Sequence, residues 1–272
     1  MKQLPRYVVL TKEVGETPLQ VQERWRKENG VADNVSLAYA GRLDPMASGK
    51  LLILIGDECK KQDDYLGLDK EYEFEVLFGC SSDSGDVLGL VSGAERATSV
   101  SLDTLRTTAR TLIGPIEVPY PVFSSKPVDG KPLFLWKLED RLSEIEIPTR
   151  ASEIYRLTCH GTRTMDAKEL EKTIRSKVDS LPEVVEESKR LGADFRREEI
   201  RAAWDAFFRD TTESAFQIAT FRCICSSGTY MRTLAEHIGR QIGAPALAFS
   251  IRRTAIGKYQ KFGLLGFWRR RL

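Results

Sequence analysis

The sequence contains few of the residues on which common enzyme mechanisms depend. Only two of its 272 residues are histidines, His160 and His237. The sequence therefore offers few candidates for a histidine base or a histidine-rich metal site. The longest apolar runs, such as residues 51–55, have the length of a strand and fall far short of the ~20 residues that span a bilayer. The N-terminus lacks the apolar region of a signal peptide. We therefore expect a protein without a membrane partner.

The five cysteines are odd in number and lack the spacing of a disulfide framework. Such cysteines fit a reducing compartment and predict a cytoplasmic protein. Cys223 and Cys225 alternate with Ile224 in a strand-like run without a second cysteine pair, which favours buried structural thiols over a zinc site. The sequence also has no Gly-x-Gly-x-x-Gly after a strand, no Walker lysine and no His-Glu-x-x-His helix. We expect neither a metal nor a cofactor.

The near-neutral net charge hides an uneven distribution. The chain has 41 Lys and Arg against 39 Asp and Glu, a formal net charge of +2. Residues 222–272 hold ten basic residues and one acid, Glu236, so they carry +9 and the first 221 residues carry −7. A cationic end on an acidic body predicts a polyanionic partner, with nucleic acid as the first candidate. The alternative is a solvated end, and we expect residues 257–272 to form a short basic C-terminal tail.

Strands and helices alternate along the chain without the regular rhythm of a Rossmann fold. Thr17, Pro18 and Gln20 predict a capped helix start, and Asp129-Gly130 predicts a tight hairpin. The expected strands are 7–10, 51–55, 72–77, 144–147, 154–159 and 215–225, and the expected helices are 18–27, 102–113 and 229–242. This order predicts a mixed α/β (α+β) fold in a single domain, residues 1–272.

Residues 166–213 differ from the rest of the chain. They are densely charged, have a helical period and are interrupted at Pro182 and Gly192. Their 13 acids and 10 bases are mixed, which makes them a poor clamp for a polyanion. We expect a helical insertion within the domain that forms a solvated elaboration.

The segment 39–49, Tyr-Ala-Gly-Arg-Leu-Asp-Pro-Met-Ala-Ser-Gly, has the composition of a functional loop. Asp44 precedes a proline, which restricts its backbone to extended conformations, and glycines flank it on both sides. A carboxylate fixed on a loop before a buried strand is well placed to act as a nucleophile or a base. The other interpretation is an Asp-Pro turn that caps a strand, and spacing alone favours that turn.

Five blocks in the same order resemble the motifs of TruB-type pseudouridine synthases. The first four blocks are Lys12, Gly15 and Thr17; Gly41, Leu43-Asp44-Pro45, Ala47 and Gly49; Asp69-Lys70-Glu71-Tyr72; and Phe123-Ser124-Ser125-Lys126 with Asp129-Gly130-Lys131. The fifth is Cys225-Ser226-Ser227-Gly228-Thr229-Tyr230-Met231-Arg232-Thr233-Leu234, followed by Leu247 and Arg252-Arg253-Thr254. The resemblance covers most of the chain except residues 166–213. It implies the pseudouridine-synthase core, a mixed antiparallel sheet flanked by helices with a cleft across its middle.

The resemblance also implies a reaction and its catalytic residues. The family isomerises the tRNA T-loop uridine conventionally numbered 55 to pseudouridine, without metal or cofactor. Asp44 matches the catalytic carboxylate, which attacks the sugar or the base or takes the C2′ proton. Tyr72 matches the residue that stacks on the flipped base, although an ordinary inward strand tyrosine is the alternative. Arg232 lies one turn into the last helix, where it can pair with Asp44 and keep it ionised.

RNA contacts follow from the same motifs. Ser226 precedes a helix N-terminus that suits a phosphate, and Tyr230 lies in the same block. Lys70, Lys126, Arg252 and Arg253 are expected on an RNA-facing surface, although each alone could be a solvated charge. Tyr39 stands where the family has a histidine and keeps a flat π-face. Arg42 replaces a small residue beside the catalytic pair, where it can add a phosphate contact.

Other departures concern the substrate more than the reaction. The acidic turn after the tyrosine strand is only partly kept, as Asp83 and Asp86. The residues after Arg253 leave no room for the PUA-type module common in the family. We expect a monomer that acts on the T-arm of tRNA. The alternatives are a related synthase acting on another RNA, including an RNA-guided one, which the missing module disfavours, and a non-catalytic RNA-binding or tRNA-folding protein on the same scaffold.

Overall fold

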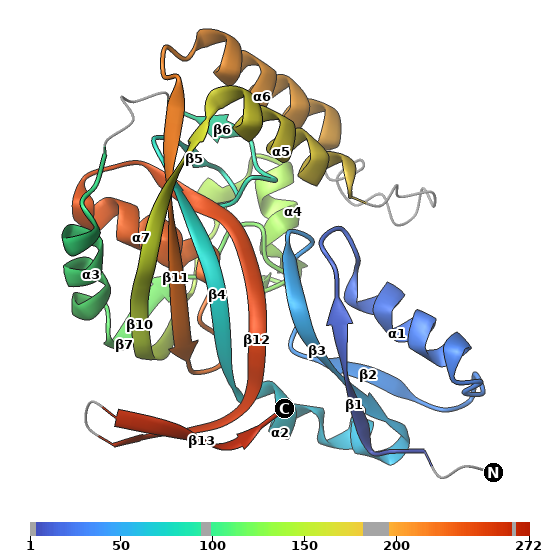
Figure 1. The fold of residues 1–272 in the computed structure, drawn as a ribbon. Helices are drawn as coiled ribbons and strands as arrows, with labels where there is room; N and C mark the ends of the chain where they lie inside the picture. The colour runs from blue at the N-terminus through green and yellow to red at the C-terminus, as the bar shows by residue number, and fades with distance from the viewer. Residues whose placement is uncertain (1–3, 94–98, 182–195, 263–264) are drawn as a thin grey trace.

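The computed structural model describes residues 4–93, 99–181, 196–262 and 265–272. Nine described strands form one sheet in the order β1-β3-β12-β4-β11-β10-β7, with β2 paired to β3 and β13 paired to β12 (Figure 1). The strands are β1 (Tyr7–Lys12), β2 (Leu37–Ala40), β3 (Ala47–Ile55), β4 (Asp69–Phe78), β7 (Gly114–Pro119), β10 (Thr149–Asp166), β11 (Ala215–Cys225), β12 (Ala246–Phe262) and β13 (Leu265–Arg271). Neighbours are antiparallel except β3 and β12, which are parallel. The expected mixed fold is confirmed.

Short elements and helices complete the structure. The helices are α1 (Pro18–Glu28), α2 (Gln62–Leu66), α3 (Leu102–Thr111), α4 (Leu133–Leu138), α5 (Ala167–Asp179), α6 (Arg197–Asp210) and α7 (Met231–Ile242), with 3-10 turns at Gly56–Lys61 and Leu142–Glu144. Two small hairpins pair β5 (Ser81–Ser82) with β6 (Val91–Ser92) and β8 (Pro127–Val128) with β9 (Lys131–Pro132). No helix within these described ranges is both long and apolar enough to cross a membrane.

Local sequence signals account for several of these boundaries. The predicted capping box forms, because the Thr17 hydroxyl accepts from Gln20 N and the Gln20 side chain accepts from Thr17 N. Asp129 and Gly130 both have positive φ, 48° and 77°, as a two-residue hairpin between β8 and β9 requires. The strand expected over 144–147 is wrong: a 3-10 turn ends at Glu144, and β10 begins only after Pro148, which has no N–H for a ladder.

The core lies between the central strands and the helices that cover them. Helices α3 and α7 pack on β10 and β12, respectively. Phe74 of β4 and Phe221 of β11 are fully buried and stack with ring centroids 5.5 Å apart. The central strand β4 is therefore packed tightly against its neighbour β11.

The segment 166–213 contains α5 and α6, which lie side by side at one end of the sheet (Figure 1). The expectation of a solvated elaboration holds only for the outer faces, because the inner faces of both helices belong to the main core; the predicted interruptions at Pro182 and Gly192 lie outside the described residues. Leu170 and Ile174 of α5 and Trp204 of α6 are almost completely buried. The Trp204 Nε1–H also donates to Val87 O at 3.0 Å. The helical period thus marks packing faces that bury apolar side chains.

The basic tail expected over residues 257–272 is also wrong. Residues 257–262 are the second half of β12, and Leu265–Arg271 are β13, paired to it antiparallel. Tyr259 stacks on Tyr155 of β10 at 5.6 Å, and Arg271 forms an ion pair with Glu71 at 3.1 Å. The basic residues of this region therefore lie in a hairpin, and the residues that its side chains contact, Tyr155 and Glu71, are distant in the sequence.

Candidate active site

A cleft of about 860 Å³ brings together most of the predicted site residues. Those that line it are Tyr39, Arg42, Asp44, Lys70, Tyr72, Lys126, Ser226, Tyr230, Arg232 and Arg253. Arg252 is exposed and does not line the cleft. Residues from separate sequence blocks therefore converge on one cavity, which is what a shared function requires.

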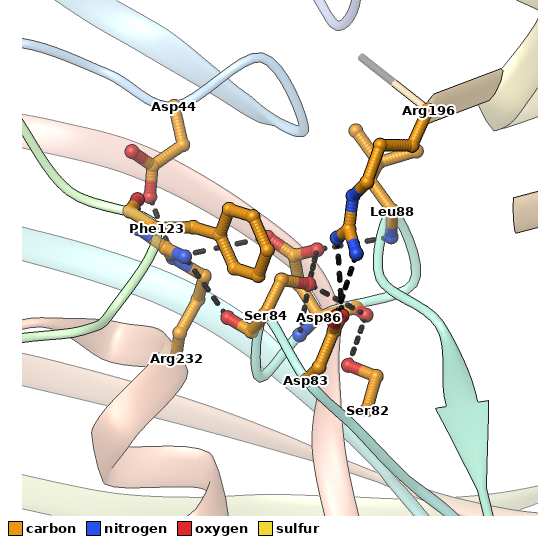
Figure 2. A network of polar contacts seen from close by, with 9 residues as sticks. All are labelled: Asp44, Ser82, Asp83, Ser84, Asp86, Leu88, Phe123, Arg196 and Arg232. Carbon is orange, nitrogen blue, oxygen red and sulfur yellow. Dashed lines mark hydrogen bonds and ion pairs between the residues drawn. The ribbon is translucent and has the colours of Figure 1, made fainter. Parts of the chain in front are cut away.

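The predicted pairing of Asp44 with Arg232 is confirmed: Nε of the arginine lies 2.8 Å from Oδ2 of the aspartate (Figure 2). The Arg232 side chain is only 5% exposed, whereas Asp44 is 39% exposed. The carboxylate thus faces the cleft while its counter-ion is embedded in the protein. Burial lowers the pKa of Arg232, but the nearby charges of Asp44 and Asp86 outweigh it and raise the pKa overall. The guanidinium remains a permanent cation.

A second carboxylate, that of Asp86, lies beside the Asp44–Arg232 ion pair. Asp86 Oδ2 lies 3.8 Å from Arg232 Nε, and its Oδ1 accepts from Ser84 Oγ at 2.8 Å and from Leu88 N at 2.9 Å (Figure 2). Burial raises the pKa of Asp86, and the Arg232 charge opposes that shift. The sequence pattern indicated Asp86 only as part of an incomplete acidic turn. Its place beside Arg232 depends on how β12 and α7 approach that turn.

Two backbone carbonyls fix the remaining nitrogens of the Arg232 guanidinium. Nη1 donates to Ser84 O at 2.9 Å, and Nη2 donates to Phe123 O at 3.3 Å. Because a guanidinium is planar, these contacts set the plane in which Nε meets Asp44. The acidic turn, residues 83–86, and the segment 120–126 therefore both orient the Asp44–Arg232 pair.

The loop that carries Asp44 rests on two buried cations. Arg253 is 1% exposed and donates through its guanidinium to Lys50 O at 2.7 Å, Gly41 O at 3.0 Å and Arg42 O at 3.3 Å. Lys12 Nζ donates to Ala47 O at 2.6 Å. The expectation that Arg253 contacts RNA phosphates from a surface is wrong, because these carbonyls occupy its guanidinium. Arg253 instead holds the loop in place.

Gly49 permits this close approach. Its φ is 105°, and a Cβ there would lie 2.3 Å from Arg253 O. Only glycine fits such a position between two strands. The sequence block that ends at Gly49 is thus a structural requirement as well as a motif.

Lys70 is likewise buried and is not a surface cation. Although the residue lines the cleft, its Nζ donates to Leu66 O at 2.8 Å and to Leu68 O. Burial, followed by the charge of Arg253, lowers the pKa of Lys70 to about 8. The prediction of a surface phosphate contact is therefore wrong for this residue.

Tyr72 lies on β4 and presents its side chain to the cleft. Burial raises its pKa to about 12, with the nearby Arg253 charge opposing the shift. The phenol is therefore neutral at physiological pH and can donate a hydrogen bond. Its ring is the flat surface that the stacking hypothesis needs.

Aromatic and basic side chains border the cleft on both sides. Arg42 Nη1 donates to Ser125 Oγ at 2.7 Å, and its Cζ lies 5.8 Å from the centroid of the Tyr39 ring. Lys126 Nζ lies 5.3 Å from the ring of Tyr120, which itself meets Tyr230 edge-on at 5.8 Å. Arg42 thus joins the loop that carries Asp44 to the segment 120–126. Sequence reasoning missed Tyr120, since no spacing signal distinguishes it.

The turn before α7 is tied to neighbouring strands. Ser226 Oγ accepts from Glu153 N at 2.8 Å, and Ser227 Oγ donates to Leu66 O at 2.6 Å. A Cβ on Gly228, whose φ is 93°, would meet Arg150 Nε at 2.4 Å. Arg150 is a further cation near the site that sequence reasoning missed. The phosphate-binding role of Ser226 stays a prediction.

Metal ligands are not grouped in the part of the chain that the structure describes. Within residues 4–93, 99–181, 196–262 and 265–272, no three His, Cys, Asp or Glu side chains are arranged to hold an ion. Cys223 and Cys225 are buried free thiols, as predicted.

Comparison with known proteins agrees with this geometry. Residues 31–181 match the family described as TruB family pseudouridylate synthase (N terminal domain). Among curated relatives, tRNA pseudouridine synthase 4 of Saccharomyces cerevisiae is 27% identical over 271 residues, which cover 88% of this chain and 67% of that protein. The tRNA pseudouridine synthase B of Azoarcus sp. is 31% identical over 81% of this chain and 55% of its own length. That of Bordetella avium is 28% identical over 93% of this chain and 81% of its own.

The chain thus spans only about half the length of several curated relatives, for example 55% of the Azoarcus protein. The solved Cbf5-Nop10-Gar1 complex contains a chain with the same fold, with a TM-score of 0.54 and 17% identity over 92% of this chain and 48% of that one. The family match covers more than half of the sequence, including the loop of Asp44 and the strand of Tyr72. This chain therefore belongs to the TruB family of pseudouridylate synthases.

Proposed function

We propose that this protein is a tRNA pseudouridine synthase that isomerises the T-loop uridine at position 55. The observation that carries the proposal is the Asp44 carboxylate, held at a cleft by the buried Arg232 and with Tyr72 lining the same cavity. Relatives named tRNA pseudouridine synthase B support the choice of tRNA as substrate.

The reaction suits these side chains. Pseudouridine formation breaks the C1′–N1 bond of uridine, rotates the uracil and joins C5 to C1′, while a proton leaves C5 and N1 gains one. No electrons are exchanged with another molecule. Asp44 supplies the carboxylate that starts the sequence, either by attack on C1′ or on the base, or by removal of the C2′ proton. Arg232 favours the charged form of Asp44 in each case.

The target uridine must leave its stack to reach Asp44. Extrusion of a base costs a few kcal/mol, and aromatic side chains that receive the base recover part of it. Tyr72 is the proposed stacking partner, and Tyr39 offers a flat ring where the family has histidine. Tyr120 and Tyr230 add further aromatic surface beside the cleft. This lining favours a nucleobase over a small polar substrate.

Positive charge near the cleft supports an RNA backbone as the ligand. Arg42 and Lys126 border the cavity, and Arg252 is exposed outside it. The hairpin of β12 and β13 adds exposed Lys258 and Arg269. We assign these side chains to the salt-dependent part of tRNA binding.

The two rival functions make different demands on the site. A synthase that acts on another RNA keeps the same chemistry, and only the modified position separates the two. A non-catalytic RNA-binding or tRNA-folding protein has no need for a carboxylate paired with a buried arginine.

A single chain supplies every group named above, which fits a monomer. Its five free thiols fit the cytoplasm.

Mapping of pseudouridine at base resolution tests the proposal. The protein is incubated with an unmodified tRNA transcript and with a matched transcript that has cytidine at position 55. We expect one new pseudouridine, at position 55, in the first transcript and none in the second. A modified site elsewhere, or none in any tRNA or in total RNA, contradicts the proposal.

A further inference from the structure

Two described residues of the segment 166–213 line the cleft, Leu181 and Arg196, and Arg196 is the charged one. It immediately precedes α6 and has a φ of 56°, a left-handed backbone conformation that residues with a side chain rarely adopt. Such a conformation persists only where surrounding contacts fix it. Trp204 anchors α6 through its bond to Val87 O, directly beyond the acidic turn. The helix that follows Arg196 is therefore anchored next to the acidic turn.

Its guanidinium joins two segments that are far apart in the sequence. Nη1 lies 2.7 Å from Asp83 Oδ2, and Nη2 lies 3.2 Å from Asp83 Oδ1, which makes the pair bidentate (Figure 2). The two side chains are only 12% and 20% exposed. The Arg196 Cζ also lies 4.2 Å from the centroid of the Phe123 ring. One side chain thus contacts both the acidic turn and the segment 120–126.

These two segments are the ones that orient Arg232. Ser84, next to Asp83, accepts from Arg232 Nη1, and the Phe123 carbonyl accepts from Nη2. Asp83 is itself fixed, because Leu90 N donates to its Oδ1 at 2.8 Å. Any shift of Phe123 relative to the turn would rotate the guanidinium plane and change the approach of Nε to Asp44.

We propose that Arg196 is a positioning residue: it clamps Phe123 to the Asp83 turn so that Arg232 stays aligned with Asp44. This inference rests on the proposed function and gives the helical segment 166–213 a part in it. The competing assignment is a direct phosphate contact. Low exposure and the bidentate pair with Asp83 argue against it, because the charge is already neutralised and one N–H of each terminal nitrogen is engaged.

The test compares Arg196→Ala with Arg201→Ala. Arg201 lies on α6 and forms ion pairs with Asp179 and Glu198, away from the cleft. We expect Arg196→Ala to lower the single-turnover rate of pseudouridine formation by about tenfold or more, while the Kd for tRNA and its salt dependence stay within about threefold. Arg201→Ala keeps the wild-type rate. Arg196→Lys recovers part of the rate, because an amine keeps the charge but not the planar stack.

A double variant tests the clamp as a unit. Arg196→Ala combined with Asp83→Asn is expected to be no slower than the slower single variant. Additive losses contradict a shared clamp. A weaker Kd with a flatter salt dependence at an unchanged single-turnover rate identifies a phosphate contact and overturns the inference, as does an Arg196→Ala rate equal to that of Arg201→Ala. If Arg196→Ala does not fold, Phe123→Leu removes the stacking partner and must slow turnover in the same way.

One readout does not depend on activity. The Nε–H resonance of Arg232 in a ¹⁵N-arginine spectrum is expected to shift in Arg196→Ala and to stay in place in Arg201→Ala. An unshifted resonance in both variants overturns the inference even if no pseudouridine is formed. Conversely, if the wild-type protein forms no pseudouridine but the Arg232 resonance shifts in Arg196→Ala, only the proposed function is contradicted.

Discussion

Arg232 is buried, and Asp44, 2.8 Å from it, is open to the cleft. The pair is therefore asymmetric: the cation cannot move to solvent, whereas the carboxylate meets whatever enters the cavity. Asp86, whose carboxylate lies 3.8 Å from the Arg232 Nε, also balances the buried charge of Arg232. If Asp44 acts as proposed, this arrangement lets it react without leaving an isolated cation inside the protein.

Loss of the arginine should be severe. Arg232→Met leaves Asp86 buried without a counter-ion and Asp44 without its partner. We expect the single-turnover rate to fall at least about 100-fold, because Asp44 loses the charge that favours its ionised form and the contact that orients it. Arg240→Ala is the matched control, since Arg240 lies on the same helix and its side chain is exposed, 3.8 Å from Glu236. Equal rates for the two variants would remove Arg232 from the mechanism.

Tyr72 variants separate the ring from the hydroxyl. Tyr72→Phe keeps the ring and should bind tRNA with a Kd within about threefold of wild type, but its turnover should fall because the neutral phenol no longer donates a hydrogen bond. Tyr72→Leu should lose both affinity and turnover. Binding titrations and single-turnover assays measure the two effects. A Tyr72→Leu variant that binds and reacts like wild type contradicts the stacking role.

The buried Lys70 predicts a pH dependence of stability. Its pKa is about 8 in the folded chain, against 10.5 as the ordinary value, so the unfolded chain binds more protons between these two pH values. The Lys70 contribution therefore makes the free energy of unfolding rise with pH in this interval. Lys70→Met should show a rise between pH 7.5 and 9.5 that is smaller by about 2 kcal/mol.

Urea denaturation at the two pH values measures this difference. Lys172→Met is the control, because Lys172 is exposed on α5. The other titratable groups contribute equally to the pH dependence of unfolding in all three proteins, so their contributions cancel in the comparison. An identical pH dependence in wild type and Lys70→Met would show that Lys70 is not desolvated in the folded protein.

The β12–β13 hairpin should contribute to tRNA affinity through its exposed cations. Arg270 donates to Tyr7 Oη and Arg271 pairs with Glu71, so a deletion of residues 269–271 would also remove structural contacts. Substitution of Lys258 and Arg269 avoids this. Lys258→Gln with Arg269→Gln should weaken tRNA binding. It should also reduce the slope of log K against log salt by roughly 0.7–0.9 for each phosphate that the protein no longer neutralises. Lys172→Gln is the control, and an unchanged slope in the double variant means that this hairpin lies away from the RNA.

Local signals predicted the parts of the fold that local interactions determine. The capped start of α1, the Asp129-Gly130 turn and the strand β11 agree with the sequence patterns, because capping groups, positive φ and alternation act over a few residues. The hairpin of β13 was missed because its partner strand and Tyr155 supply the driving contacts.

The candidate site was predictable only in part, and for a similar reason. Motif resemblance paired Asp44 with Arg232, whose spacing alone indicates no contact. Nothing in the sequence indicated Arg196, which meets Asp83 at a separation of 113 residues. The burial of Lys70 and Arg253 was also missed, because a charge pattern does not reveal that backbone carbonyls surround a cation.

The most direct test of the account is the Asp44→Asn variant with an unmodified tRNA transcript. Asparagine keeps the size of the side chain but removes the charge, so the variant should bind tRNA with a Kd within about threefold of wild type. Base-resolution mapping should find pseudouridine at position 55 with wild-type protein and none with Asp44→Asn. Pseudouridine at position 55 at the wild-type rate in the variant would contradict the assignment of Asp44 as the catalytic carboxylate.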